Sequence, residues 1–115
     1  MTSTRRPPTV STLRGSAPVF GALGDPTRLR IVSRLCNHGP MSIAKLTTTA
    51  GVTRQAVAKH LRVLEDAGII HSFRRGRTRI CRLESQRLEQ VRLDLAAISD
   101  QWDVTLARLR KFVEA

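Results

Sequence analysis

The chain has 115 residues, 41% of them apolar, which suffices for one small domain with a modest core and leaves no room for a second. No apolar run approaches the ~20 residues of a membrane span, and the N-terminal segment lacks the apolar core of a signal peptide, so we expect a cytoplasmic protein. The formal net charge of +11 favours a polyanionic partner. No Gly-rich phosphate loop and no nucleophile beside an evident base is present, so we do not expect an enzyme.

Residues 1–16 mix Thr, Ser, Pro and Arg without hydrophobic periodicity. Too little apolar area is available there to offset the entropy of ordering the chain, so we expect a flexible basic arm. The arm could contact a neighbouring phosphate or minor groove, but a plain disordered tail is the interpretation that we favour.

A second helix is well specified after a short first helix that ends at Gly24. Asp25 provides its N-cap and Pro26 its first position. Arg28 falls in the first turn, where the helix dipole disfavours a cation, so a phosphate, an acidic neighbour or simple solvation would explain it. We expect the arginines of this helix to point outward and its inner face to consist of Leu29, Val32 and Leu35, with Ile31 close by.

A helix-turn-helix is predicted in the middle of the chain. Ser42 can cap a third helix that ends near Ala50, and Gly51 then makes a sharp turn. Thr53 opens the next helix, which should end near Ala67. A helix, a short glycine turn and a second helix form this motif. The spacing of apolar residues on the second helix predicts a buried stripe of Val57, Leu61 and Leu64.

Two short strands should follow, at residues 69–75 and 78–83, joined by a turn at Gly76. The turn is bracketed by Arg74, Arg75, Arg77 and Arg79. A helix-turn-helix followed by an arginine-tipped hairpin predicts a mainly α fold with a small β-hairpin wing, a winged helix-turn-helix.

The positive charge is concentrated in that winged segment. Residues 1–16 and 17–52 each contribute +3, residues 53–83 contribute +6, and residues 84–115 contribute −1. A solvated basic surface without a partner is the alternative, but it would rarely load one hairpin tip with four arginines. We favour nucleic acid over a membrane because no amphipathic helix pairs this charge with exposed apolar residues.

The last segment, residues 85–115, carries apolar residues at alternating spacings of three and four, on either one long helix or two. We expect Leu88 and Val91 to join the intramolecular core and the later positions to pack against a second copy of the chain. The domains would therefore be an arm at 1–16, a DNA-binding domain at 17–84 and a dimerisation segment at 85–115. The predicted dimer interface consists of Val19, Phe20, Leu23, Ile98, Trp102, Leu106, Leu109, Phe112 and Val113.

Four runs carry a resemblance to a known family: ALGDPTRLRIVSRL, IAKL, GVTRQAVAKHLRVLEDAGII and RRGRTRICRL. In this order they resemble the ArsR/SmtB family of bacterial winged-helix repressors, over roughly residues 19–83, with Trp102 and Leu109 a looser match. The resemblance implies a homodimeric repressor of a pseudo-palindromic operator. The second helix of its helix-turn-helix would enter the major groove, and its wing would follow the backbone.

The residue chemistry agrees with DNA recognition. Arg54 and Gln55 carry long donors suited to guanine and adenine edges. Ala58 stands where relatives commonly have serine, so a hydroxyl contact is missing, although its methyl group can meet a thymine methyl. Lys59, His60 and Arg62 can contact phosphates or further bases. The remaining predicted DNA-binding residues are Arg28, Ser42, Thr53, Ala56, Arg74, Arg75, Arg77 and Arg79.

The metal-binding motifs of the family's best-known members are lacking, since the third helix reads SIAKLTTTA and the last segment contains no His or Cys. The three histidines suit no single site, so we expect no metal and no cofactor. Cys36 and Cys81 should be buried apolar fillers, while a thiol switch between them stays open. The effector ligand is unknown. The alternative function is a basic winged-helix module for protein or RNA assembly.

Overall fold

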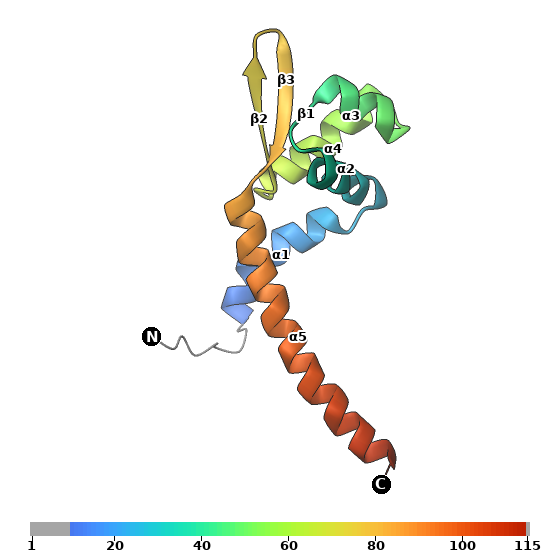
Figure 1. The fold of residues 1–115 in the computed structure, drawn as a ribbon, viewed down its shortest axis with the longest axis vertical. Coiled ribbons are helices and arrows are strands. Elements are labelled where there is room, and N and C mark those ends of the chain that lie inside the picture. Colours follow the sequence, from blue (N-terminus) through green and yellow to red (C-terminus); the bar gives the residue numbers. More distant parts are fainter. Residues whose placement is uncertain (1–9, 115) are drawn as a thin grey trace.

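The computed structural model describes residues 10–114 and shows a mainly helical winged helix-turn-helix from which one long helix extends (Figure 1). The wing hairpin rises at one end of the compact part, and the C-terminal helix runs past the first helix and away from it. The elements in order are α1 (Val10–Leu23), α2 (Pro26–His38), β1 (Met41–Ser42), α3 (Ile43–Ala50), α4 (Arg54–Asp66), β2 (Ile70–Arg75), β3 (Thr78–Leu83) and α5 (Ser85–Glu114).

The three predicted helix caps are confirmed. The side chains of Asp25, Ser42 and Thr53 each accept a hydrogen bond from the backbone N–H three residues further on, at 3.0, 3.2 and 3.2 Å. These bonds satisfy amides that have no partner within the helix. They fix where α2, α3 and α4 begin, and so set the geometry of the helix-turn-helix.

The wing is a three-stranded antiparallel sheet in the order β1-β3-β2, rather than a hairpin alone. The predicted hairpin is confirmed, with Arg75 opposite Thr78 across a two-residue turn. Gly76 has a φ of 64° and Arg77 has no positive φ, a pattern typical of a II′ turn. The extra strand β1 pairs Met41 with Cys81, and two residues are too few to show a strand pattern in the sequence.

The first helix starts at Val10 rather than near Val19, so the prediction of a flexible segment through residue 16 is wrong for residues 10–16. The physical reason is packing against α5, which the local sequence does not reveal. Ser16 is fully buried and donates a hydrogen bond to the carboxylate of Asp94 on α5. The rest of the predicted arm, residues 1–9, lies outside the described residues.

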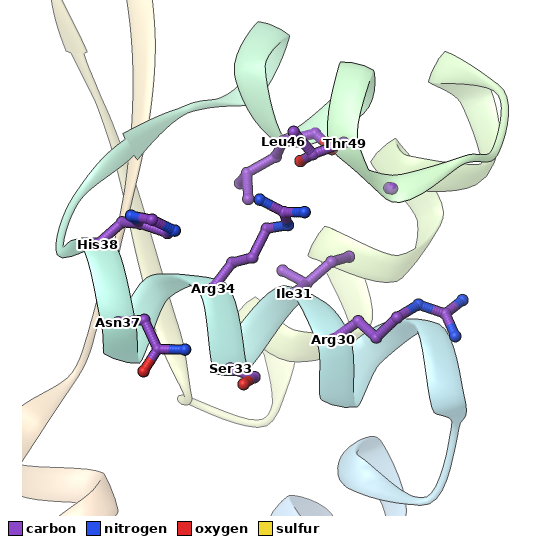
Figure 2. Close-up of a pocket in the computed structure, with 9 residues that line it drawn as sticks. Arg30, Ile31, Ser33, Arg34, Asn37, His38, Leu46 and Thr49 are labelled. Atoms are coloured by element: carbon purple, nitrogen blue, oxygen red, sulfur yellow. The ribbon is translucent and has the colours of Figure 1, made fainter.

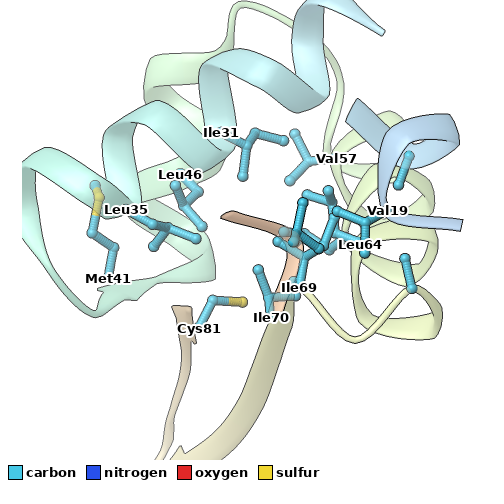
Figure 3. Close-up of a cluster of buried hydrophobic side chains, with 14 residues drawn as sticks. Val19, Ile31, Leu35, Met41, Leu46, Val57, Leu64, Ile69, Ile70 and Cys81 are labelled. Carbon is cyan, nitrogen blue, oxygen red and sulfur yellow. The ribbon is translucent and has the colours of Figure 1, made fainter. Parts of the chain in front are cut away.

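The core lies between α1, α2, α4 and the base of the wing (Figure 3). The predicted stripe of α4 is confirmed, since Val57, Leu61 and Leu64 are all buried. The predicted inner face of α2 is partly wrong, because Leu29 is 51% exposed. Arg28 occupies the inner position instead, on the same side of the helix as the buried Ile31 and Leu35.

The C-terminal segment is one helix of 30 residues. Val91 is buried in the core and Leu88 is partly buried against it, as predicted. From residue 99 to residue 114 every position of α5 is exposed. Among the described residues, the second half of α5 therefore buries none of its side chains within its own subunit.

Candidate nucleic-acid interface

The outer face of α4 is polar and lies opposite its buried stripe. Arg54 and Gln55 stand in its first turn, where free backbone amides and the helix dipole favour negative charge. Within the described residues neither side chain has a hydrogen bond or an ion pair, so both are available to an external partner. The exposed predicted residues on this helix are Arg54, Gln55, Ala58, Lys59 and Arg62.

The wing concentrates arginines without internal compensation. The strand register places Arg74 directly opposite Arg79, a like-charge pair that destabilises a sheet. Arg79 donates to the hydroxyl of Ser72 at 3.3 Å. Among the described residues none of the four arginines at the hairpin tip forms an ion pair. An external polyanion would supply the missing counter-charge.

A groove of about 540 Å³ connects the start of α4 with the wing. It brings together several of the predicted DNA-binding residues, and no carboxylate lines it. Four arginines around one concave surface form a cationic site with the charge and donors that suit a phosphate backbone. We call it the wing groove, and its lining residues are Ile43, Ala44, Arg54, Arg74, Arg77, Thr78 and Arg79.

Sequence reasoning missed three of those residues, because none is charged. Ile43 and Ala44 form the start of α3, and Thr78 closes the hairpin turn. Their positions were deducible from the cap at Ser42 and from the two-residue turn, but the chemistry of their side chains gave no hint of a binding role. They provide the shape of the wing groove, while the arginines provide its charge.

Arg28 and His60 do not lie in the wing groove. His60 is only 21% exposed at its side chain, and its Nδ1 lies 3.8 Å from the Asp25 carboxylate and 3.4 Å from a guanidinium nitrogen of Arg28. Arg28 also donates to the carbonyl of Ala22. These contacts connect α1, α2 and α4, so the two residues are placed to orient α4.

Asp25, at the centre of this connection, is held in its charged form. The backbone N–H of Arg28 lowers the pKa of the Asp25 carboxyl, and the charge of Arg28 acts in the same direction. A charged carboxylate at the start of α2 also interacts favourably with the helix dipole. The first turn of α2 therefore has its own acidic neighbour, one of the explanations that the sequence left open for Arg28.

Three other predicted residues have local roles. The hydroxyls of Ser42 and Thr53 accept the capping hydrogen bonds described above. Ala56 is half-buried on the side of α4 toward His60. Their contribution to an interface is therefore to shape the two helix starts beside the wing groove.

Comparison with known proteins identifies the family. A helix-turn-helix domain model matches residues 23–72. An uncharacterized HTH-type transcriptional regulator, YuzN of Bacillus subtilis, is 38% identical over 79 residues, which span 64% of this chain and 86% of that protein. The solved structure of an ArsR-like transcriptional regulator from Rhodococcus sp. RHA1 is 35% identical, with a TM-score of 0.73 over 90% of this chain and 96% of that one. The chain belongs to the ArsR family.

Membership of this family confirms the resemblance seen in the sequence. The ArsR family consists of helix-turn-helix transcriptional regulators, so this member acts by binding DNA and is not an enzyme. A winged helix-turn-helix domain from Mycobacterium bovis, solved in solution as a homodimer, shares the fold at 20% identity and a TM-score of 0.63, covering 87% of this chain and 92% of that one.

An apolar face runs along α5 of this ArsR-family protein beyond the point where α1 covers it. Trp102 is 65% exposed and Phe112 is 82% exposed. They lie on the same side of the helix as the buried Val91. We call this surface the α5 face, and it consists of Leu95, Ile98, Trp102, Leu106, Leu109, Phe112 and Val113.

The predicted interface residues of α1 behave differently from those of α5. Val19 is fully buried in the core of its own subunit, so its assignment to a dimer interface is wrong. Its neighbours Phe20 and Leu23 are partly buried against the same core and keep some accessible surface. The physical reason is that α1 packs on both α4 and α5, and Val19 is on the side that faces them.

The prediction that both cysteines are buried holds only for Cys81, because Cys36 is exposed on α2. Burial raises the pKa of the Cys81 thiol to about 11, and the nearby Glu65 carboxylate contributes in the same direction. A thiol that stays protonated is a poor nucleophile.

Within residues 10–114 no three His, Cys, Asp or Glu side chains are grouped as metal ligands. In the same residues no helix is long and apolar enough to cross a membrane.

Proposed function

We propose that this ArsR-family regulator is a homodimeric repressor that reads a pseudo-palindromic operator. The observation that carries the proposal is the wing groove. It joins Arg54 on α4, which we call the reading helix, to three wing arginines without a carboxylate between them. The arginines of the wing groove repel one another in the free protein, and phosphates that fill the groove would remove this repulsion.

The roles divide along the surface. Arg54 and Gln55, at the exposed start of α4, are placed to read base edges, and the methyl group of Ala58 can meet a thymine methyl. The other exposed cations fix the register of the protein on the backbone without reading sequence. They are Lys59, Arg62, Arg74, Arg75, Arg77 and Arg79.

A second copy of the chain would cover the α5 face. A monomer rarely exposes so long an apolar stripe, and the face continues directly from residues that are already buried against α1. A two-fold pairing through α5, with contributions from Phe20 and Leu23, would present two α4 helices about one DNA turn, roughly 34 Å, apart. The homodimeric relative from Mycobacterium bovis supports this assembly.

The test is a fluorescence-anisotropy titration with duplex DNA from the promoter nearest the gene and with a scrambled duplex of equal composition. We expect tight binding to the first and weak binding to the second. If the dimer neutralises about eight phosphates, log K should fall with log salt at a slope of about −7. Equal affinity for both duplexes would refute sequence-specific repression, and tighter binding to RNA would favour the assembly module.

Two variants sharpen the test. Gln55→Ala should relax the base preference at one position of each half-site, at a cost of about 1–3 kcal/mol per base contact. Arg110→Ala is the matched control, because it also truncates a long polar side chain on an exposed helix position, but on α5 and away from its apolar face. If Gln55→Ala keeps the wild-type preference among duplexes, as the control variant should, Gln55 does not read a base.

A further inference from the structure

A second concave site lies on the other side of α3, between α2 and α3 (Figure 2). It encloses about 340 Å³, within the range of small-molecule sites. Arg34 extends from α2 into it toward Leu46 and Thr49 of α3. Ile31 and Leu46 form an apolar floor, since both are almost completely buried in the core below. We call this site the α2–α3 cleft.

The walls of the α2–α3 cleft are cationic. Arg30, Arg34 and His38 follow one another at intervals of four residues, so they stack along one side of α2. Arg30 and Arg34 are like charges, and such a pair at this spacing destabilises a helix. A neighbouring hollow of similar size shares Arg34 and His38 and adds Lys45 from the start of α3. Arg34, His38 and Lys45 thus lie around the gap between the two helices, whereas Arg30 at its edge donates to the hydroxyl of Thr27 at 3.1 Å.

No carboxylate balances them. No acidic residue lines either hollow, and Asp25 is the single acid between residues 17 and 52. Asp25 is already engaged by Arg28 and His60. Arg34 has no hydrogen bond or ion pair among the described residues. Its planar donor fork is therefore free to bind a carboxylate or phosphate through two hydrogen bonds.

The position of the cleft separates it from the proposed DNA surface. The cleft uses Leu46, Thr49 and Ala50 in the later part of α3, whereas the wing groove uses Ile43 and Ala44 at its start, and no residue lines both. A DNA backbone has no apolar body to place on the floor of Ile31 and Leu46. A small molecule that combines an anionic group with an aromatic or aliphatic body matches both the walls and the floor.

We propose that the α2–α3 cleft is a binding site for a small organic anion, held at its charged group by Arg34 and at its apolar body by Ile31 and Leu46. Thr49 also lines the cleft, but its hydroxyl already donates to the carbonyl of Lys45 at 3.0 Å, so it contributes shape rather than a donor. Because α3 is the first helix of the helix-turn-helix, an occupant between α2 and α3 would alter how α3 supports α4. This regulatory consequence rests on the proposed repressor function, whereas binding itself does not.

The experiment follows backbone amide shifts of the whole protein, without DNA, during a titration with benzoate. We expect saturable shifts centred on Arg34, His38 and Thr49. Benzyl alcohol, which has the same ring without the charge, and inorganic phosphate, which has charge without the ring, should each bind at least about tenfold more weakly. Arg34→Gln should weaken benzoate binding by about tenfold or more, whereas the matched control Arg110→Gln should not change it.

Three results would overturn the proposal. Shifts centred on Arg54 and Arg74 would place benzoate in the wing groove. Phosphate binding more tightly than benzoate would indicate an inorganic anion site. A duplex titration of Arg34→Gln tests the third possibility: loss of about one unit of salt slope per protomer would make the cleft part of the DNA surface. Because the benzoate titration contains no DNA, its result stands whether or not operator binding is found.

Discussion

Neutralising Arg74 should change fold stability and DNA affinity in opposite directions. In the free protein Arg74 lies directly across the hairpin from Arg79, where side-chain Cβ atoms are about 5 Å apart. Cross-strand charge pairs at this separation contribute about 0.2–1 kcal/mol, and for like charges the sign is unfavourable. Arg74→Gln removes the repulsion while keeping a long polar side chain. We expect the melting temperature of the variant to rise by about 2 °C, which corresponds to a gain of roughly 0.5 kcal/mol in the free energy of unfolding.

DNA binding should weaken in the same variant. If Arg74 contacts one phosphate in each half-site, the dimer loses two phosphate contacts and its salt slope becomes shallower by about 1.8. The ratio of wild-type to variant affinity should therefore fall about twelvefold between 50 and 200 mM salt. Thermal unfolding at fixed protein concentration and anisotropy titrations at four salt concentrations measure the two effects.

Arg82→Gln is the matched control for the stability effect. It removes a charge from the same hairpin, but Arg82 lies 3.4 Å from the Glu84 carboxylate and loses an attractive partner. Its melting temperature should stay unchanged or fall. In 1 M salt, where the screening length is about 3 Å, the gain from Arg74→Gln should disappear. A lower melting temperature for Arg74→Gln, or an unchanged salt slope, would refute the reasoning about the wing.

Three further predictions concern assembly and the thiols. Trp102→Ala combined with Leu109→Ala should convert the proposed dimer to monomer in sedimentation experiments. Operator binding should weaken, because a monomer contacts only one half-site. If the double variant stays dimeric, the dimer interface does not lie on the α5 face. Native protein at pH 8 should be alkylated at Cys36 alone, with Cys81 reacting only after unfolding, as counted by mass spectrometry. Because burial raises the pKa of Cys81 to about 11 from an ordinary value of 9.0, the unfolded chain loses this proton first and stability should fall as pH rises from about 9 to 11.

Local sequence signals were sufficient for most of the DNA-binding domain. The caps at Asp25, Ser42 and Thr53, the stripe of α4 and the turn at Gly76 each depend on interactions within a few residues, and all appear as predicted. The turn chemistry and the capping preferences act through the adjacent backbone. Such features need no knowledge of the tertiary structure.

Features that depend on distant partners were not predictable in this way. The early start of α1 depends on bonds to α5, 78 positions away in the case of Ser16 and Asp94. Arg28 points inward and Leu29 outward because Arg28 contacts the carbonyl of Ala22 on α1 and the ring of His60 on α4. A charged residue at an inner helix position contradicts the hydrophobic pattern, and only its specific partners compensate for its burial.

The long-range contacts also link α4 to the proposed dimer interface on α5. Arg87, near the start of α5, donates one hydrogen bond to the carbonyl of Ala67, directly after the reading helix, and another to the carbonyl of Gly15 on α1. The same α5 helix carries the apolar face on which a second subunit would pack. In the proposed dimer, the separation of the two reading helices therefore depends on how α5 is held against α1 and α4. A shift of α5 relative to either helix would change that separation, and an operator with fixed half-site spacing would detect the change as lost affinity.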